Sequence, residues 1–125
     1  MFRRFFMLQT FYLNNMHELT WQEFQKVDLR IGTIIKAEQF KEALKPAYKL
    51  LIDFGELGII KSSAQITSLY SAEELIGKQI VAVVNFPKKQ IGPMMSECLV
   101  LGSVNKDEVT LLQPERAVRN GSKIS

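Results

Sequence analysis

The sequence predicts an all-β fold in which one small barrel forms most of the domain. Short apolar runs with the alternation typical of β-strands recur five or six times along the chain. Turn-forming residues separate these runs, about every eight to twelve positions. A single helical segment lies between the third and fourth runs. Short strands at this spacing favour a barrel or sandwich over an α/β architecture.

The first predicted element is a short helix in the segment TWQEFQKV. Thr20 followed by Glu23 has the spacing of a capping box, and we expect Trp21 and Phe24 to pack inward. The next segment, residues 27–40, alternates apolar and polar side chains and is predicted to be the first strand. A glycine in its middle indicates a bend, a bulge or a close backbone approach, as at the corner of a barrel.

A polar loop, KEALKPAY, leads to a predicted hairpin made of residues 48–54 and 59–66, which the tight turn GELG connects. Residues 71–77 then have the start and stop signals of a short helix. Ser71 is a good N-cap, two acids follow in the first turn, and a glycine ends the segment.

The fourth predicted strand, QIVAVVNF, is almost entirely apolar, which indicates burial on both faces or closure in a barrel. The fifth is SECLVLGSV, and NKDEVTLLQP adds a polar turn and one more short strand. The resulting order, β-β-β-α-β-β, is the order of the OB-fold, a five-stranded Greek-key barrel. The fold class is therefore predicted as an OB-fold with a short N-terminal helix, a helix between strands 3 and 4, and a C-terminal extension.

The composition gives little support to an enzyme or a metal protein. The chain has one cysteine, Cys98, and one histidine, His17, so an intramolecular disulfide is impossible and a zinc site would need carboxylate ligands. The acids fall on separate elements, and no glycine-rich phosphate loop is present. We therefore predict no catalytic activity, no cofactor and no metal, in a protein of the reducing cytoplasm.

Residues 1–15, MFRRFFMLQTFYLNN, are predicted to be an N-terminal extension outside the fold, with the domain occupying residues 16–125. Arg3 and Arg4 supply two of the three net positive charges, so the rest of the chain is nearly balanced. The apolar run is interrupted and too short to cross a bilayer, so no membrane insertion is expected. An upstream extension or a misassigned start codon is the preferred interpretation, and a membrane-touching amphipathic arm is the alternative.

The segment VVNFPKKQIGPMMSE, residues 83–97, is predicted to be a loop between strands four and five, which in an OB-fold flanks the ligand face. It places two lysines, Lys88 and Lys89, near Asn85 and Ser96. Lysine can neutralise phosphate, and Asn and Ser can bond to phosphate, ribose or a base edge. The alternative is a solvated hairpin loop in which proline and glycine only set the turn.

The segment KSSAQI is the second candidate, because small polar residues interrupt a predicted barrel strand. Lys61, Ser62 and Ser63 would leave room for a ligand to approach the sheet. A bulged edge strand with satisfied hydroxyl groups explains the same residues equally well.

Apolar residues beside the two lysines indicate a different ligand. Met94 and Met95 lie between a proline and a serine in the predicted loop, where we expect both side chains to be exposed unless a partner covers them. Methionine adapts to varied apolar partners such as peptide side chains. Together with Phe86, this pair makes unfolded polypeptide a second candidate ligand.

Six segments resemble the CsaA group of tRNA-binding-domain proteins, over about residues 19–124: VDLRIGTIIKAEQF, KLLIDFG, IKSSAQIT, GKQIVAVVNFPKKQIG, SECLVLG and LLQPERAVRNGSKI. The resemblance implies a non-catalytic OB-fold homodimer, with the LTWQEF helix and the tail from Leu111 to Ile124 at the dimer interface. It implies tRNA binding by shape, and a chaperone role in protein export with unfolded preproteins and the SecA translocase as partners. Relatives often carry a further basic residue where this chain has Gln90.

Carried over to this sequence, the resemblance implies these RNA-facing residues: Lys61, Ser62, Ser63, Asn85, Lys88, Lys89 and Ser96. The residues Phe86, Met94 and Met95 are the candidates for binding peptide. A chaperone that binds only polypeptide, with no physiological RNA ligand, is the alternative function.

Overall fold

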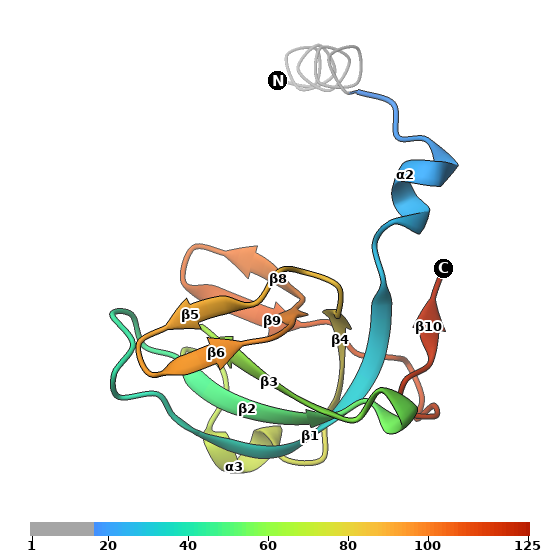
Figure 1. Cartoon of the computed structure of the whole chain (residues 1–125). Coiled ribbons are helices and arrows are strands. Elements are labelled where there is room, and N and C mark those ends of the chain that lie inside the picture. Colours follow the sequence, from blue (N-terminus) through green and yellow to red (C-terminus); the bar gives the residue numbers. More distant parts are fainter. Residues whose placement is uncertain (1–16) are drawn as a thin grey trace, which may run out of the picture.

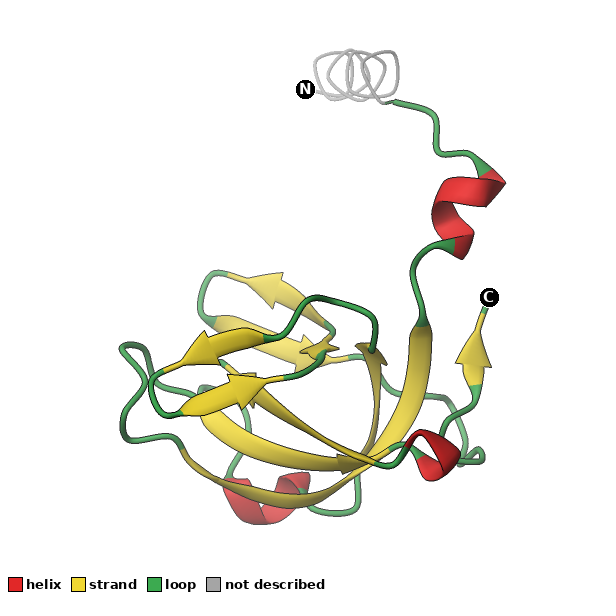
Figure 2. Cartoon of the chain, viewed as in Figure 1, coloured by secondary structure: helices red, strands yellow, loops and turns green. Residues whose placement is uncertain are grey.

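The computed structural model describes residues 17–125, and Figure 1 shows a strand-rich barrel with short helices at its periphery. The elements in chain order are α2 (Trp21–Gln25), β1 (Leu29–Gln39), β2 (Tyr48–Asp53), the 3-10 helix η1 (Gly55–Leu57), β3 (Ile59–Ala64), α3 (Ala72–Leu75), β4 (Gln79–Val83), β5 (Lys89–Ile91), β6 (Met94–Ser96), β7 (Leu99–Val100), β8 (Gly102–Asn105), β9 (Glu108–Leu111) and β10 (Lys123–Ile124). Strands predominate throughout (Figure 2).

The main sheet is antiparallel and has the strand order β3-β2-β1-β4-β7, with β10 pairing with β1. β1 is long enough to pair with β4 through its first half and with β2 through its second half. The register shifts between Ile34 and Lys36, a β-bulge that lets the strand curve from one side of the barrel to the other. The predicted all-β, OB-like barrel is confirmed.

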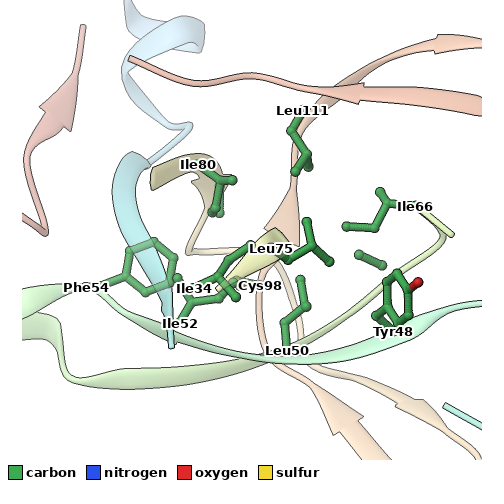
Figure 3. Packing of buried hydrophobic residues seen from close by; sticks show 12 residues of the cluster. Ile34, Tyr48, Leu50, Ile52, Phe54, Ile66, Leu75, Ile80, Cys98 and Leu111 are labelled. Carbon is green, nitrogen blue, oxygen red and sulfur yellow. The ribbon is translucent and has the colours of Figure 1, made fainter. Parts of the chain in front are cut away.

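The core fills the barrel with apolar side chains from every main strand (Figure 3). Leu75 of α3 is fully buried, so this short helix closes one end of the barrel. Gly32 lies where β1 crosses the core, and a Cβ atom there would sit 2.7 Å from atoms of both Ile52 and Phe54. Glycine is therefore required at this position in the first strand, because the side chains of Ile52 and Phe54 approach its backbone closely, as the sequence indicated.

The two predicted helix N-termini are confirmed, but the predicted packing of the first helix is wrong. Thr20 and Glu23 form a complete capping box at α2, and Ser71 forms another at α3. Trp21, however, is 60% exposed, and its ring lies 5.6 Å from that of Phe24 between centroids. The helix has five residues and projects away from the barrel, so its apolar side chains do not reach the core (Figure 1).

The tail after β9 has no regular period in the sequence, yet it is fastened along β1. The Gly121 amide donates to the Ile31 carbonyl at 2.7 Å, and the Ile31 amide donates to the Ser122 carbonyl at 3.0 Å. The Thr33 hydroxyl donates to Oδ1 of Asn120 at 2.7 Å. These bonds lead the chain into β10, a strand that was not predicted.

The predicted N-terminal extension, residues 1–15, lies outside the described residues, as does the first residue of the predicted domain. Within residues 17–125, no helix is both long enough and apolar enough to cross a membrane.

Candidate nucleic-acid interface

The segment predicted as a loop between strands four and five contains a short antiparallel hairpin, β5–β6. Lys89 pairs with Ser96, and Ile91 pairs with Met94. The chain reverses at Gly92, whose φ of +53° suits glycine. The predicted loop therefore contains two paired strands, and this hairpin lies beside β3 (Figure 1).

A second, smaller core fastens this hairpin to the polar loop between β1 and β2. Met94 from the hairpin packs with Phe40 and Ala47, and all three are buried. The predicted exposure of Met94 is wrong, because only 8% of this residue is accessible. Met95 is half-buried. Phe86, before the hairpin, is 52% exposed and is the most accessible of the three predicted peptide-binding residues.

Side chains join β3 to the β6–β7 segment, where the barrel closes. The Ser63 amide donates to Oγ of Ser96 at 3.0 Å. The Lys61 amide donates to Oε1 of Glu97 at 3.0 Å, and the Glu97 amide returns a bond to the Lys61 carbonyl at 2.9 Å. These bonds use the backbone of β3, so they attach the strand to the closing segment without involving the side chains of Lys61 and Ser63.

Ser62 lies inside the barrel and is not accessible to a ligand. It is fully buried, and its hydroxyl donates to the Cys98 carbonyl at 3.0 Å. Neighbouring strand residues face opposite sides of a sheet, so Ser62 and Ser63 cannot both face a ligand. Burial also raises the pKa of the Cys98 thiol to about 11, which keeps the thiol protonated at neutral pH.

Glu97 connects the closing segment to the basic hairpin. Its carboxylate lies 3.5 Å from the ammonium of Lys88. The pKa of Glu97 is lowered first by the hydrogen bond from the Lys61 amide and then by Lys88. Lys88 is still largely exposed, but this carboxylate partly offsets its charge. Lys89 is also exposed, and it has no carboxylate within 4.0 Å among residues 17–125.

Further lysines face outward from the sheet beneath the hairpin. The β1–β2–β3 registers place Lys36, Leu51 and Lys61 in one cross-strand row. The neighbouring row consists of Glu38, Lys49 and Ser63. Neither Lys36 nor Lys49 was among the sequence-predicted site residues. The bulge before Lys36 interrupts the alternation of β1, and the pairing of β1 with β2 places Lys49 on the same face. An alternation restarted after Ile35 would have predicted this outward face.

Asn85 lies at the end of β4, and its amide is engaged by the backbone that leads into β1. Its Oδ1 accepts from the Asp28 amide at 2.9 Å, and its Nδ2 donates to the Lys26 carbonyl at 2.7 Å. Asn85 therefore fixes where the chain enters the barrel. The sequence-predicted site residues with outward-facing polar side chains are Lys61, Ser63, Lys88 and Lys89.

Comparison with known proteins agrees with this architecture. The family described as "Putative tRNA binding domain" matches residues 29–123. The methionine–tRNA ligase of Methanococcoides burtonii is 36% identical over 107 residues, which is 85% of this chain but 16% of the ligase. The ligase of Archaeoglobus fulgidus is 32% identical over 90% of this chain and 17% of that enzyme. The chain thus spans about one sixth of the length of these curated relatives.

Two solved structures match over their whole length. The chaperone CsaA of Bacillus anthracis is 55% identical with a TM-score of 0.84, covering 87% of this chain and 100% of that one. The CsaA chaperone of Picrophilus torridus is 51% identical with a TM-score of 0.81, covering 86% of this chain and 100% of that one. The chain therefore belongs to the tRNA-binding-domain family and, within it, to the CsaA type.

Proposed function

We propose that the chain is a non-catalytic, cytoplasmic protein that binds tRNA through the outward face of β1–β3 together with the β5–β6 hairpin. The observation that carries this proposal is the convergence of exposed lysines on that face. Lys61 and Lys36 come from the sheet, and Lys88 and Lys89 come from the hairpin. A local patch of this kind can neutralise phosphates even though the domain as a whole is nearly uncharged.

The proposed contacts are Lys61, Lys88 and Lys89 to phosphates, with Ser63 as a hydrogen-bonding neighbour. Ser62 and Ser96 are left out of the interface because their hydroxyls bond within the barrel and its closing segment. Asn85 is assigned a positioning role at the entrance to β1 for the same reason.

Filter binding of a tRNA pool over a range of salt concentrations tests the proposal. Affinity should fall with salt, with a logarithmic slope of roughly 0.7–0.9 for each neutralised phosphate. The double variant Lys88→Gln/Lys89→Gln should lower that slope by roughly 1.4–1.8 if both side chains contact phosphate. Lys106→Asn is the matched control, because Lys106 is exposed on the separate β8–β9 hairpin and its φ of +59° suits asparagine. Retention that is absent or independent of salt would exclude the proposed function.

A second candidate function is that of a chaperone that binds unfolded preproteins in protein export, with SecA as a further partner. The exposed Phe86 and half-buried Met95 beside the hairpin favour it, as does the similarity to proteins named as CsaA chaperones. Phe86→Ser should weaken suppression of the aggregation of a denatured client, while Leu44→Ala, at a fully exposed position in the β1–β2 loop, should not. Unchanged suppression by Phe86→Ser would count against this surface. If tRNA binding fails while suppression holds, the alternative of a purely polypeptide-binding chaperone stands.

We also propose that the protein is a homodimer joined through α2 and the tail. Leu19 is 67% exposed and Trp21 is 60% exposed, so an apolar surface lies uncovered on α2 and the segment just before it. A second copy would cover it. Light scattering at micromolar concentration should give twice the monomer mass, and Trp21→Ser should shift the protein toward monomer. A wild-type monomer at that concentration would refute the dimer.

A further inference from the structure

A cavity of about 160 Å³ opens on the outward face of the sheet, where the hairpin approaches β1–β3. Its lining combines three lysines and one carboxylate with apolar side chains: Lys36, Lys49, Lys61, Glu38, Leu51 and Met94. Pockets that enclose a whole drug-sized ligand are roughly 300–1,000 Å³. This cavity is therefore sized for a single ring or side chain from a larger partner.

The sheet register gives the cavity a defined order of groups. Lys36 pairs with Leu51, and Leu51 pairs with Lys61, so a leucine lies between two lysines on three adjacent strands. Since neighbouring strands are about 4.8 Å apart, the two lysine backbones are roughly 10 Å from each other. Leu51 is half-buried in this row, and Met94 lines the cavity from the hairpin.

The charges around the cavity favour an anionic ligand. Lys49 is held by Glu38 at 3.6 Å and lies over the Phe40 ring at 5.5 Å from its centroid. Lys36 and Lys61, in contrast, have no carboxylate within 4.0 Å among residues 17–125. Two cations without a close ion pair thus lie on either side of the apolar side chain of Leu51, although the Glu97 carboxylate attracts Lys61 at longer range.

We infer that this cavity takes the base of a single unpaired nucleotide, with Lys36 and Lys61 on the phosphates at either side of it. A paired RNA helix presents its backbone to the lysines but leaves Leu51 without a partner, whereas Met94 already packs against Phe40 and Ala47. An apolar peptide side chain fills the seat but makes no use of the two cations. An unpaired nucleotide uses both, because its base has an apolar face and its flanks are charged. The inference rests on the proposed RNA-binding function and specifies which part of the RNA this surface recognises.

Two RNA duplexes that differ only by one unpaired nucleotide provide the test. At fixed salt, the duplex with the unpaired nucleotide should bind about fivefold more tightly, at the low end for a base-stacking partner. Leu51→Ala should remove this preference and leave binding of the fully paired duplex unchanged. Leu44→Ala, at an exposed position in the β1–β2 loop, should retain the preference. Circular dichroism and the thermal midpoint check that each variant folds.

A fluorescent adenine analogue at the unpaired position reports directly on the seat, since its emission changes with its stacking environment. Its emission should change on binding to the wild type and to Leu44→Ala, and much less with Leu51→Ala. Lys36→Gln provides a second variant, which should weaken the unpaired duplex more than Lys106→Asn does.

The outcomes separate the two proposals. If neither duplex and no tRNA binds, the proposed function fails. If both duplexes bind equally and Leu51→Ala changes nothing, RNA binding stands and the nucleotide seat is refuted. If Leu51→Ala instead abolishes binding of an unfolded polypeptide while the preference for the unpaired nucleotide survives, the cavity belongs to peptide and the inference is overturned.

Discussion

Met94→Ala tests whether the second core holds the hairpin against the barrel. The residue is 8% exposed and packs against Phe40 and Ala47. Truncating a buried methionine costs about 2–5 kcal/mol, and a cluster with only three buried members should lie at the lower end, at about 2–3 kcal/mol. A two-stranded hairpin is marginally stable alone. The loss should therefore appear as local opening of β5–β6 rather than as unfolding of the barrel.

Native-state amide hydrogen exchange measures this opening directly. A loss of about 2–3 kcal/mol corresponds to exchange about 30- to 150-fold faster at the hydrogen-bonded amides of the hairpin, with the amides of β1 and β2 nearly unchanged. Met95→Ala is the matched control, because Met95 is adjacent in β6 but lies outside the buried cluster. Equal acceleration in both variants, or acceleration confined to the barrel, would refute the anchoring role of Met94.

Three further predictions concern the closing segment of the barrel. Ser62→Ala should lower the free energy of unfolding, measured by urea titration, by about 1–3 kcal/mol, because it leaves the buried Cys98 carbonyl without its donor. The affinity for tRNA at constant salt, measured by filter binding, should stay the same. A large loss of affinity would show that Ser62 belongs to the interface. The Cys98 thiol, whose pKa burial raises to about 11, should react with iodoacetamide no faster than the protein unfolds, and labelling at the rate of a free cysteine would contradict its burial. The hydrogen bond from the Lys61 amide and, to a smaller extent, Lys88 hold the pKa of Glu97 below its ordinary value of 4.5. The carboxylate therefore stabilises the fold above that pH, and this stabilisation is lost as the pH falls through the lowered pKa. The urea midpoint of Glu97→Gln should accordingly depend less on pH in the acidic range, and an identical pH dependence would exclude a contribution from Glu97.

The features that the sequence predicts well are those that depend on neighbouring residues. Both capping boxes rest on side chains three residues apart, and the strands of the barrel follow the alternation of apolar residues. The alternation of side chains along β3 also limits which of the RNA-facing residues implied by the family resemblance can lie on one face. Ser62 and Ser63 are adjacent on β3, so only one of them can face outward.

The features that the sequence does not predict depend on contacts between distant segments. Met94 is buried because it packs against Phe40 from the loop between β1 and β2. Nothing within the hairpin sequence indicates that partner. Lys36 faces outward because a bulge shifts the register of β1 against β2. β10 forms because Gly121 and Ser122 bond to β1, far away along the chain. Tertiary pairing determines each of these arrangements.

The pairing of β10 with β1 brings the two ends of the barrel together. Leu29 lies opposite Ile124, so the chain enters and leaves the fold at the same place, on the side of α2 and away from the β5–β6 hairpin (Figure 1). A polypeptide joined before β1 or after β10 would therefore emerge beside α2 and leave the lysine face uncovered. With its two ends side by side, the barrel can be fused to another domain at either end, or circularly permuted, without a change to its proposed binding surface.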